Sequence, residues 1–206
     1  MKLGQIFQPT DAEVDELVCR FPLAQVISCR SGCLSATPIP LLLNRGADGT
    51  IDLLGHLSKA NPQVADLAGG ASVLIIFQGP DSYISPSWFR DRSRAPTWNY
   101  ATAQFLATSE IYSDTENCHH TLGALAAAME KVQPRPWTTA EMAGYEKSLL
   151  GIVTFKAKVR EMRARFKLGQ NDQLWKLEDS IGGLESSGKH EIAMMMRAAN
   201  RQRIDT

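Results

Sequence analysis

The sequence predicts a β-rich α+β fold, organised as a closed or split β-barrel with peripheral and C-terminal helices. In the first half of the chain, short strand-like segments follow one another and are separated mainly by turn residues. A long segment, 96–113, alternates between apolar and polar side chains, and from Asn171 onward the apolar spacing becomes helical. Strands joined by hairpins favour a barrel over a sheet of β-α-β units.

The N-terminal part is expected to hold one helix followed by strands. Residues 10–13 (Thr-Asp-Ala-Glu) match a capping box, which predicts a short helix ending near Arg20. Pro38 and Pro40 share one face of the second strand and remove N–H donors from it, which indicates a sheet edge or a bulge. The strands expected in this part are 23–30, 34–43 and 50–56, joined by turns at 31–33 and 44–49.

A short helix and a buried strand are expected next. Asn61 is a candidate N-cap and Pro62 fits the first helical position, so a helix is predicted over 63–68. The nearly continuous apolar run 71–78 is typical of a strand buried on both faces. Residues 79–81 (Gly-Pro-Asp) then predict a turn.

The second half of the chain is expected to contain two long strands with helices between them. In 96–113 the odd positions are apolar, so one face of this strand should enter a core. Asp114 is expected to cap one helix and Thr139 to begin another short helix. Residues 151–168 are read as a strand pair or one kinked strand, because the apolar parity changes after Glu161.

The C-terminal part is expected to be helical, with an interruption near Gly188. We therefore predict a barrel domain over 1–168 and a helical extension over 169–206 that packs on the barrel. The apolar stripe that supports these helices consists of Leu174, Trp175, Leu177, Ile181 and Leu184.

Composition limits the classes of function. The 206 residues include 22 basic and 22 acidic side chains, so net charge gives no general attraction to nucleic acid or to anionic membranes. No run approaches the roughly 18 apolar residues of a membrane helix, and the start lacks an apolar signal region, so we expect a cytoplasmic protein with no membrane contact. Cys29 and Cys33 have no second pair to complete a zinc site, so no metal site is expected.

Polar side chains gather where a strand is expected to give way to a helix, over 56–62. Free N–H groups at a helix start favour an anion, Lys59 adds a full charge, and Ser58 and Asn61 add hydrogen-bond donors. This chemistry suits a phosphate. The alternative is that Asn61 only caps the helix and Lys59 is solvated, and the local chemistry leaves both interpretations open.

Three further segments combine polar and aromatic residues. Residues 78–88 could lie against a planar ring, or they could form a rigid loop with a core Trp88. The aromatic residues of 96–100 could belong to the same wall or to cross-strand pairs. Residues 165–171 end a strand and precede the C-terminal helices. The chain contains no Gly-rich Rossmann loop, P-loop or Gly-x-Ser-x-Gly elbow.

These four segments, in this order, resemble the PaiB-like FMN-binding negative transcriptional regulators, and the resemblance covers nearly the whole chain. The specific motifs are Gly-His-x-x-x-x-Asn-Pro-Gln, Phe-Gln-Gly-Pro-x-x-Tyr-Ile-Ser-Pro-Ser-Trp, Pro-Thr-Trp-Asn-Tyr and Lys-Leu-x-Gln-Asn. One departure is Phe166 after Arg165, where the family usually has Trp within Lys-Trp-Lys-Leu. Charge and aromatic character are kept there.

The resemblance implies a split β-barrel like that of pyridoxamine-phosphate oxidase, and a homodimer with FMN between the subunits. It places the phosphate at the expected cluster over 56–62, and the flavin ring beside strands two and four. Trp98, Asn99 and Tyr100 would come from the partner subunit. The cofactor-binding residues expected on this basis are Thr37, Pro38, His56, Ser58, Lys59, Asn61, Gln78, Ser85, Trp88, Trp98, Asn99, Tyr100, Lys167 and Gln170.

Three roles for a bound flavin stay open at this point. The resemblance implies a regulator that represses transcription, although the sequence shows no evident helix-turn-helix and no net basic charge. An FMN-dependent oxidoreductase is the alternative. The flavin itself would supply the redox chemistry, so the absence of a recognisable catalytic side chain does not argue against an enzyme. A flavin-binding protein without turnover is the third. DNA contact would rest on one strand-borne basic stripe, which is typical of a solvated face: Lys156, Lys158, Arg160, Arg163, Arg165 and Lys167.

Overall fold

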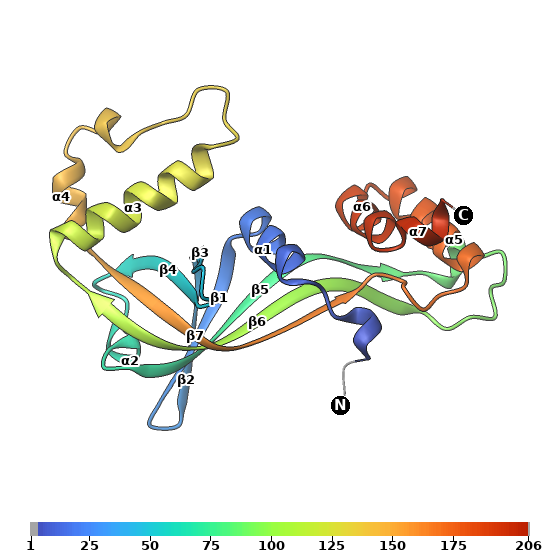
Figure 1. Ribbon diagram of the computed structural model, residues 1–206, viewed down its shortest axis with the longest axis horizontal. Helices are drawn as coiled ribbons and strands as arrows, with labels where there is room; N and C mark the ends of the chain where they lie inside the picture. Colours follow the sequence, from blue (N-terminus) through green and yellow to red (C-terminus); the bar gives the residue numbers. More distant parts are fainter. Residues whose placement is uncertain (1–3, 206) are drawn as a thin grey trace. The chain divides into compact units, whose positions relative to one another are not determined.

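The computed structural model describes residues 4–205 and confirms a β-rich α+β fold. One seven-stranded sheet has the strand order β2-β1-β5-β6-β7-β4-β3 (Figure 1). It is open, with β2 and β3 at its edges, as in a split barrel. The strands are β1 (Leu23–Arg30), β2 (Cys33–Pro40), β3 (Leu42–Arg45), β4 (Ile51–Ser58), β5 (Ala71–Ile84), β6 (Thr97–Tyr112) and β7 (Ile152–Lys167).

Helices precede, interrupt and follow the strands, as expected. The α-helices are α1 (Asp11–Arg20), α2 (Val64–Leu67), α3 (Thr115–Glu130), α4 (Tyr145–Leu149), α5 (Leu174–Ser186), α6 (His190–Ala199) and α7 (Arg201–Ile204). The 3-10 helices are η1 (Gln5–Phe7), η2 (Pro86–Trp88) and η3 (Thr139–Glu141). None of the helices within residues 4–205 is long and apolar enough to cross a membrane.

The chain forms two compact units. Unit 1 consists of the described residues up to Val14, of Gln78–Ala103, and of those from Ala164 onward. Unit 2 consists of Asp15–Phe77 and Gln104–Arg163, so β5, β6 and β7 each contribute residues to both units. This division does not follow the expected boundary after residue 168, and the two-domain organisation stays a prediction.

In unit 2, β1 and β2 form a hairpin along their full length. Ser31 and Gly32 both have positive φ, 51° and 82°, which is the backbone that a two-residue turn between twisted strands requires. Arg30 therefore lies opposite Cys33. The expected edge position of the two prolines is confirmed, because β2 pairs only with β1 in the sheet order.

A second hairpin, β3 and β4, confirms the predicted loop at 44–49. The extended segment expected over 34–43 is in fact two strands, interrupted at the buried Leu41, whose N–H donates to the Pro22 carbonyl (2.9 Å). A Cβ on Gly55 would lie 2.3 Å from the Leu41 side chain, so β4 can pass Leu41 only with a glycine there.

The core of unit 2 is built on one face of β5, β6 and β7. Phe77 and Phe105 meet edge to face with ring centroids 5.6 Å apart. The predicted alternation of 96–113 is confirmed by β6. The prediction that 71–78 is buried on both faces is wrong for the single chain, because Leu74 and Ile76 are only half-buried. The predicted turn at 79–81 is also wrong, because β5 runs through it to Ile84.

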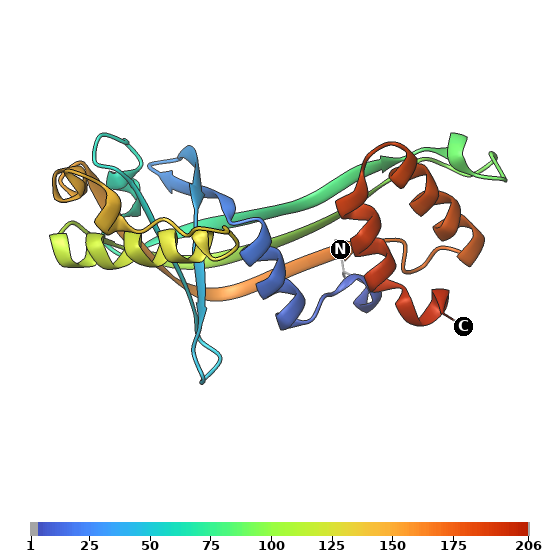
Figure 2. The same ribbon diagram turned by 90° about the horizontal axis from the view of Figure 1, so that it is seen from above.

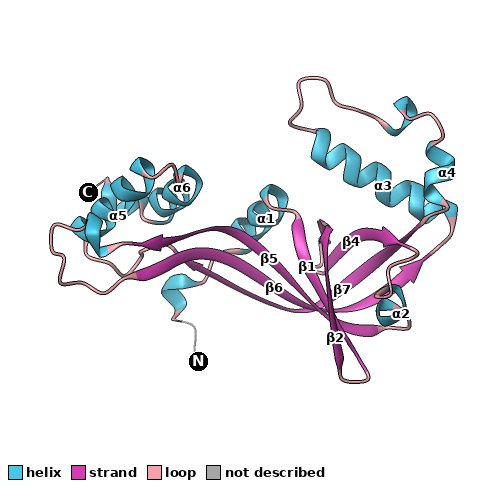
Figure 3. Cartoon of the chain, turned by 180° about the vertical axis from the view of Figure 1, so that it is seen from behind, coloured by secondary structure: helices cyan, strands magenta, loops and turns pink. Residues whose placement is uncertain are grey.

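Two predicted helix starts are confirmed by their caps. The Thr10 N–H donates to Glu13 Oε2 (2.7 Å) and the Glu13 N–H to Thr10 Oγ1 (3.3 Å), which completes the capping box of α1. Asp114 accepts from the Asn117 N–H (2.9 Å) at the start of α3. Within unit 2, α3 packs against β4 and α4 (Figure 3).

Unit 1 contains the C-terminal helices, and the expected interruption at Gly188 (φ 73°) separates α5 from α6. These two helices lie side by side (Figure 2). Gly183 is required in α5, since a Cβ there would lie 2.2 Å from the Trp88 ring. The fully buried apolar side chains of these helices include Leu177, Ile181, Leu184 and Met196.

Candidate functional site

The turn between β4 and α2 carries a lysine with no acidic partner among the described residues. The Lys59 N–H donates to the Gly151 carbonyl (2.9 Å), which fixes the backbone beyond the end of β4. Its Nζ donates to the Leu150 carbonyl (2.7 Å) and no ion pair engages it within residues 4–205. An ammonium held only by a neutral carbonyl keeps its positive charge available to an anion.

Two predicted segments meet at this turn. Asn61 Nδ2 donates to Thr37 Oγ1 of β2 (3.3 Å), and Ser58 Oγ accepts from the Ala60 N–H (3.2 Å). The structure therefore gathers Thr37, Ser58, Lys59 and Asn61 at one corner of unit 2, which we call the β4–α2 corner. Pro38, the next residue of β2, is exposed.

The helix predicted after this corner is shorter than expected. Instead of 63–68 with Asn61 as its N-cap, α2 spans only Val64–Leu67 with Gln63 before it. Asn61 Oδ1 accepts from the Gln63 N–H (2.9 Å) in a local turn. Four helical residues make only a weak dipole, so an anion at this corner would depend mainly on side chains.

Gln63 is a residue that the sequence reasoning missed. It is 1% exposed, and its Nε2 donates to the Val26 carbonyl (2.9 Å), to Ser28 Oγ (3.0 Å) and to the Ser35 carbonyl (3.2 Å). It thus ties the β4–α2 corner to both strands of the first hairpin. The motif Asn-Pro-Gln ends with this glutamine, so its position in the motif could have marked it as important. The sequence does not show that its amide is buried.

His56 precedes Ser58 by two residues and shares its side of β4. It lines an apolar groove under α3, and its Nδ1 is buried with no hydrogen-bond partner among the described residues. Burial lowers the pKa of His56, so the imidazole is neutral at pH 7. It therefore brings no positive charge to the β4–α2 corner.

In unit 1, aromatic side chains form an exposed wall on β5 and β6. Trp98 is 53% exposed and Tyr83 is 42% exposed, and their rings meet with centroids 6.1 Å apart. Tyr100 shares the strand face of Trp98 and is half-buried. Lys167 donates a hydrogen bond to the Thr97 hydroxyl, and burial lowers the pKa of its ammonium.

Asn99 cannot belong to that wall. As the odd residue between Trp98 and Tyr100 it points to the opposite face of β6, where it is 1% exposed. Its Nδ2 contacts the Met196 sulfur at 3.4 Å, and its Oδ1 has no partner within residues 4–205. Residues 98–100 were predicted together because they are consecutive in the motif. In a strand, however, consecutive side chains point to opposite faces, so Asn99 is separated from Trp98 and Tyr100.

The remaining predicted residues are engaged in local structure. Ser85 Oγ accepts from the Ser87 N–H (3.2 Å) and caps η2. Gln170 closes its own turn, because its Oε1 accepts from the Leu168 N–H (2.7 Å) and its Nε2 donates to the Phe166 carbonyl (2.6 Å). Trp88 packs on α5, in keeping with the alternative of a rigid loop, and Gln78 is exposed.

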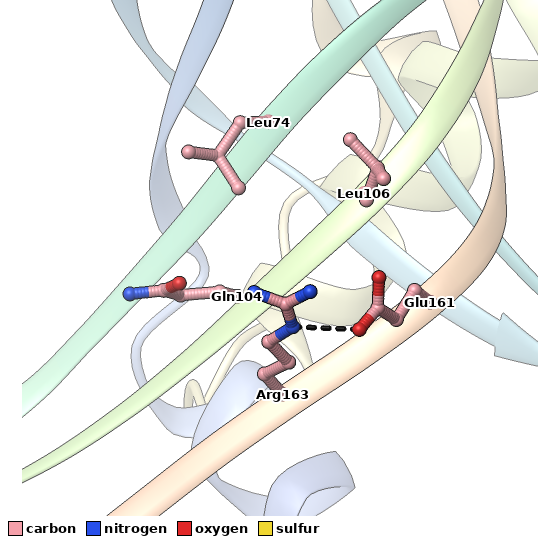
Figure 4. Close-up of a pocket in the computed structure, with 5 residues that line it drawn as sticks. All are labelled: Leu74, Gln104, Leu106, Glu161 and Arg163. Carbon is pink, nitrogen blue, oxygen red and sulfur yellow. Dashed lines mark hydrogen bonds and ion pairs between the residues drawn. The ribbon is translucent and has the colours of Figure 1, made fainter. Parts of the chain in front are cut away.

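The other face of the sheet in unit 2 is only partly covered. A hollow of about 90 Å³ opens between apolar and polar side chains of β5, β6 and β7 (Figure 4). Arg163 Nε and Glu161 Oε1 pair at 2.6 Å along one rim. Leu106 is 37% exposed, and Leu74 projects beside it from β5.

Each unit, taken by itself, offers one kind of binding chemistry. The β4–α2 corner offers one available cation, two hydroxyls and an amide, which suit a phosphate ester. The wall of Tyr83, Trp98 and Tyr100 offers exposed rings of the kind that stack on a planar group.

Comparison with known proteins agrees with this chemistry. The family model described as "Putative FMN-binding domain" matches residues 1–161. The chain is 32% identical over 174 residues to the Bacillus subtilis "Protease synthase and sporulation protein PAI 2", covering 83% of each protein.

Two solved structures share the fold. The FAD and heme binding protein from Mycobacterium smegmatis aligns with a TM-score of 0.61 and 23% identity, over 84% of this chain and 78% of that one. The flavocytochrome Anf3 from Azotobacter vinelandii aligns with a TM-score of 0.59 and 16% identity, over 81% and 71%. With the family match, these findings show that the chain belongs to the PaiB-like family of FMN-binding split-barrel proteins, and that FMN is its cofactor.

Proposed function

We propose that the protein holds the phosphate of FMN at the β4–α2 corner, through Thr37, Ser58, Lys59 and Asn61. The observation that carries this proposal is the ammonium of Lys59, which within residues 4–205 donates only to a backbone carbonyl. It belongs to the same turn as Ser58 and Asn61, and the Asn61 amide reaches Thr37. A phosphate monoester carries about −1.5 to −2 charges at pH 7, so it would gain charge-assisted hydrogen bonds there. The test is a comparison of FMN with riboflavin, which lacks the phosphate.

We also propose that the protein is a homodimer and that the partner subunit supplies Trp98 and Tyr100 to the flavin. Support comes from the sheet face around Leu74, Ile76 and Leu106. These apolar side chains are only partly buried in the single chain, and a second subunit could cover them. Light scattering during size-exclusion chromatography should give a dimer mass, and Leu106→Glu should shift it to a monomer. A monomeric wild-type protein that still binds FMN would refute the dimer.

Its biological role, we propose, is that of an FMN-binding negative regulator of transcription, and family membership supports this. The basic stripe gives little support, because Lys156 pairs with Asp52 (3.4 Å), Arg163 pairs with Glu161, and Arg160 donates to the Ser72 hydroxyl (2.7 Å). In a gel-shift assay at low salt, a regulator retards its own promoter more than random duplex, with or without FMN. Equal retardation of both duplexes would overturn the regulatory role.

The second candidate is an FMN-dependent oxidoreductase. The exposed aromatic pair Tyr83 and Trp98 favours it, because an open wall beside a flavin would leave room for a second planar molecule. FMN supplies the redox chemistry when bound, so the residues need only bind and orient. Anaerobic addition of NADH or NADPH should bleach the flavin absorbance. Absence of bleaching across a broad panel of reductants would leave a flavin-binding protein without turnover.

We propose a cytoplasmic location. Cys19, Cys29 and Cys33 are exposed and free, and Cys118 is buried and free. Exposed unpaired thiols are typical of a reducing compartment. In cell fractionation the protein should follow cytosolic markers.

A further inference from the structure

An apolar groove in unit 2 is formed between α3, α4 and the segment that joins them, with β4 beneath. It has a volume of about 290 Å³, just below the range of about 300–1,000 Å³ that is usual for small-molecule sites. The joining segment arches away from the end of α3 before it returns to α4 (Figure 1). The side chains that matter for its chemistry are His56, Leu122, Leu125, Met129, Met142 and Tyr145.

The groove is apolar and partly open. Among its lining residues there is no Lys, Arg, Asp or Glu. Trp137 is 39% exposed and Met142 is 42% exposed, so two large apolar side chains stand at the surface where a ligand could cover them. A charged ligand would find no counter-ion there, which excludes the phosphate of FMN from this groove.

Two residues that line the groove each carry a buried polar atom with no partner within residues 4–205. The Tyr145 side chain is packed with Cys118 and Leu149, it is 8% exposed, and its hydroxyl makes no hydrogen bond. His56 Nδ1, on β4, is likewise buried and unpaired. A buried polar atom without a partner costs free energy, and a ligand that supplies the missing partner recovers it.

The Tyr145 ring is held in place. It meets the His119 ring edge to face at 5.4 Å, and the Ser148 hydroxyl donates to the Tyr145 carbonyl (2.6 Å). Burial raises the pKa of Tyr145, so the phenol stays neutral and can both donate and accept a hydrogen bond. The neutral imidazole of His56 has one donor and one acceptor nitrogen.

We propose that this groove is a binding site for a small, uncharged aromatic molecule that carries one hydroxyl group. Aromatic carbon would contact the leucine and methionine side chains that line the groove, and the hydroxyl would pair with the orphaned hydroxyl of Tyr145. The groove and the β4–α2 corner are built from different side chains, and the proposal does not rest on the mode of FMN binding.

The chemical test compares 2-naphthol with naphthalene as probes of the full-length, FMN-loaded protein. 2-Naphthol should bind more tightly than naphthalene, and Tyr145→Phe should lower its affinity about threefold to tenfold, the worth of one neutral hydrogen bond. The affinity for naphthalene should not change, because the ring of residue 145 is kept. Equal affinities of the two probes, or an equal effect of Tyr145→Phe on both, would overturn the assignment of the hydroxyl.

A steric test uses two neighbouring alanines of α3. Ala126 lines the groove, so Ala126→Phe should fill it and lower probe affinity more than tenfold. Ala127 is exposed on the same helix, so Ala127→Phe is the matched control and should leave the affinity unchanged. FMN affinity should be the same in both variants. Displacement of the probe from FMN-free protein by added FMN would show that the groove belongs to the flavin site and would refute a separate site. No binding of either probe would refute it as well.

Discussion

Replacement of Lys59 by alanine tests the phosphate assignment most directly. In the absence of ligand its Nζ donates to the Leu150 carbonyl at the surface, so the variant should fold with little loss of stability. A hydrogen bond to a charged group contributes about 1–3 kcal/mol, which corresponds to about 5-fold to 150-fold weaker FMN binding. The quenching of FMN fluorescence during titration measures this change.

Riboflavin and a second lysine provide the controls. Riboflavin presents the same ring without the phosphate, so its affinity should be the same for Lys59→Ala and the wild type. Lys147 is exposed on the nearby α4, and Lys147→Ala makes the same change in net charge without touching the corner. Equal weakening of FMN and riboflavin, or an equal effect of the two lysine variants on FMN, would refute the assignment of Lys59 to the phosphate.

Three further predictions concern stability, measured by urea unfolding. Gly183→Ala should destabilise by about 1–3 kcal/mol, because its Cβ would meet a tryptophan ring at 2.2 Å, whereas Gly182→Ala, with nothing within 4 Å, should stabilise α5 by about 0.5–1 kcal/mol. Gln63→Leu should cost about 1–3 kcal/mol by leaving buried acceptors unpaired. Hydrogen bonds from Arg90 lower the pKa of Asp179 below its ordinary value of 3.8. The pair therefore stabilises the fold fully above about pH 4, and this stabilisation is lost as the pH falls through the lowered pKa. Arg90→Ala should therefore show a smaller loss of stability below about pH 4 than the wild type.

The elements that the sequence predicted well are those fixed by local chemistry. The capping box at Thr10, the Asp114 cap and the two-residue turn at Ser31 and Gly32 each depend on residues within one turn of the chain. The alternation of β6 was also readable, because one face of that strand enters the core and the other does not.

The predictions that failed depended on distant packing. Residues 79–81 have the composition of a turn, but β5 continues through them as a strand of 14 residues. The helix after Asn61 was predicted too long, and the buried amide of Gln63, which anchors the chain to the first hairpin, was not predicted. Neither a continued strand nor a buried amide leaves a periodic signal in the sequence.

The same distinction applies within the cofactor-binding motifs. A motif marks residues that are used together, but it does not say which touch the ligand and which build the scaffold. Trp88 fills the space that Gly183 leaves open, and Gln170 closes its own turn. Lys59 instead has no charged partner within the described part of the chain, and Trp98 keeps an exposed ring. Because a ligand can be bound only by groups that folding leaves available, Lys59 and Trp98 are the stronger candidates for contact with FMN, and loss of Trp88 should lower stability before it lowers FMN affinity.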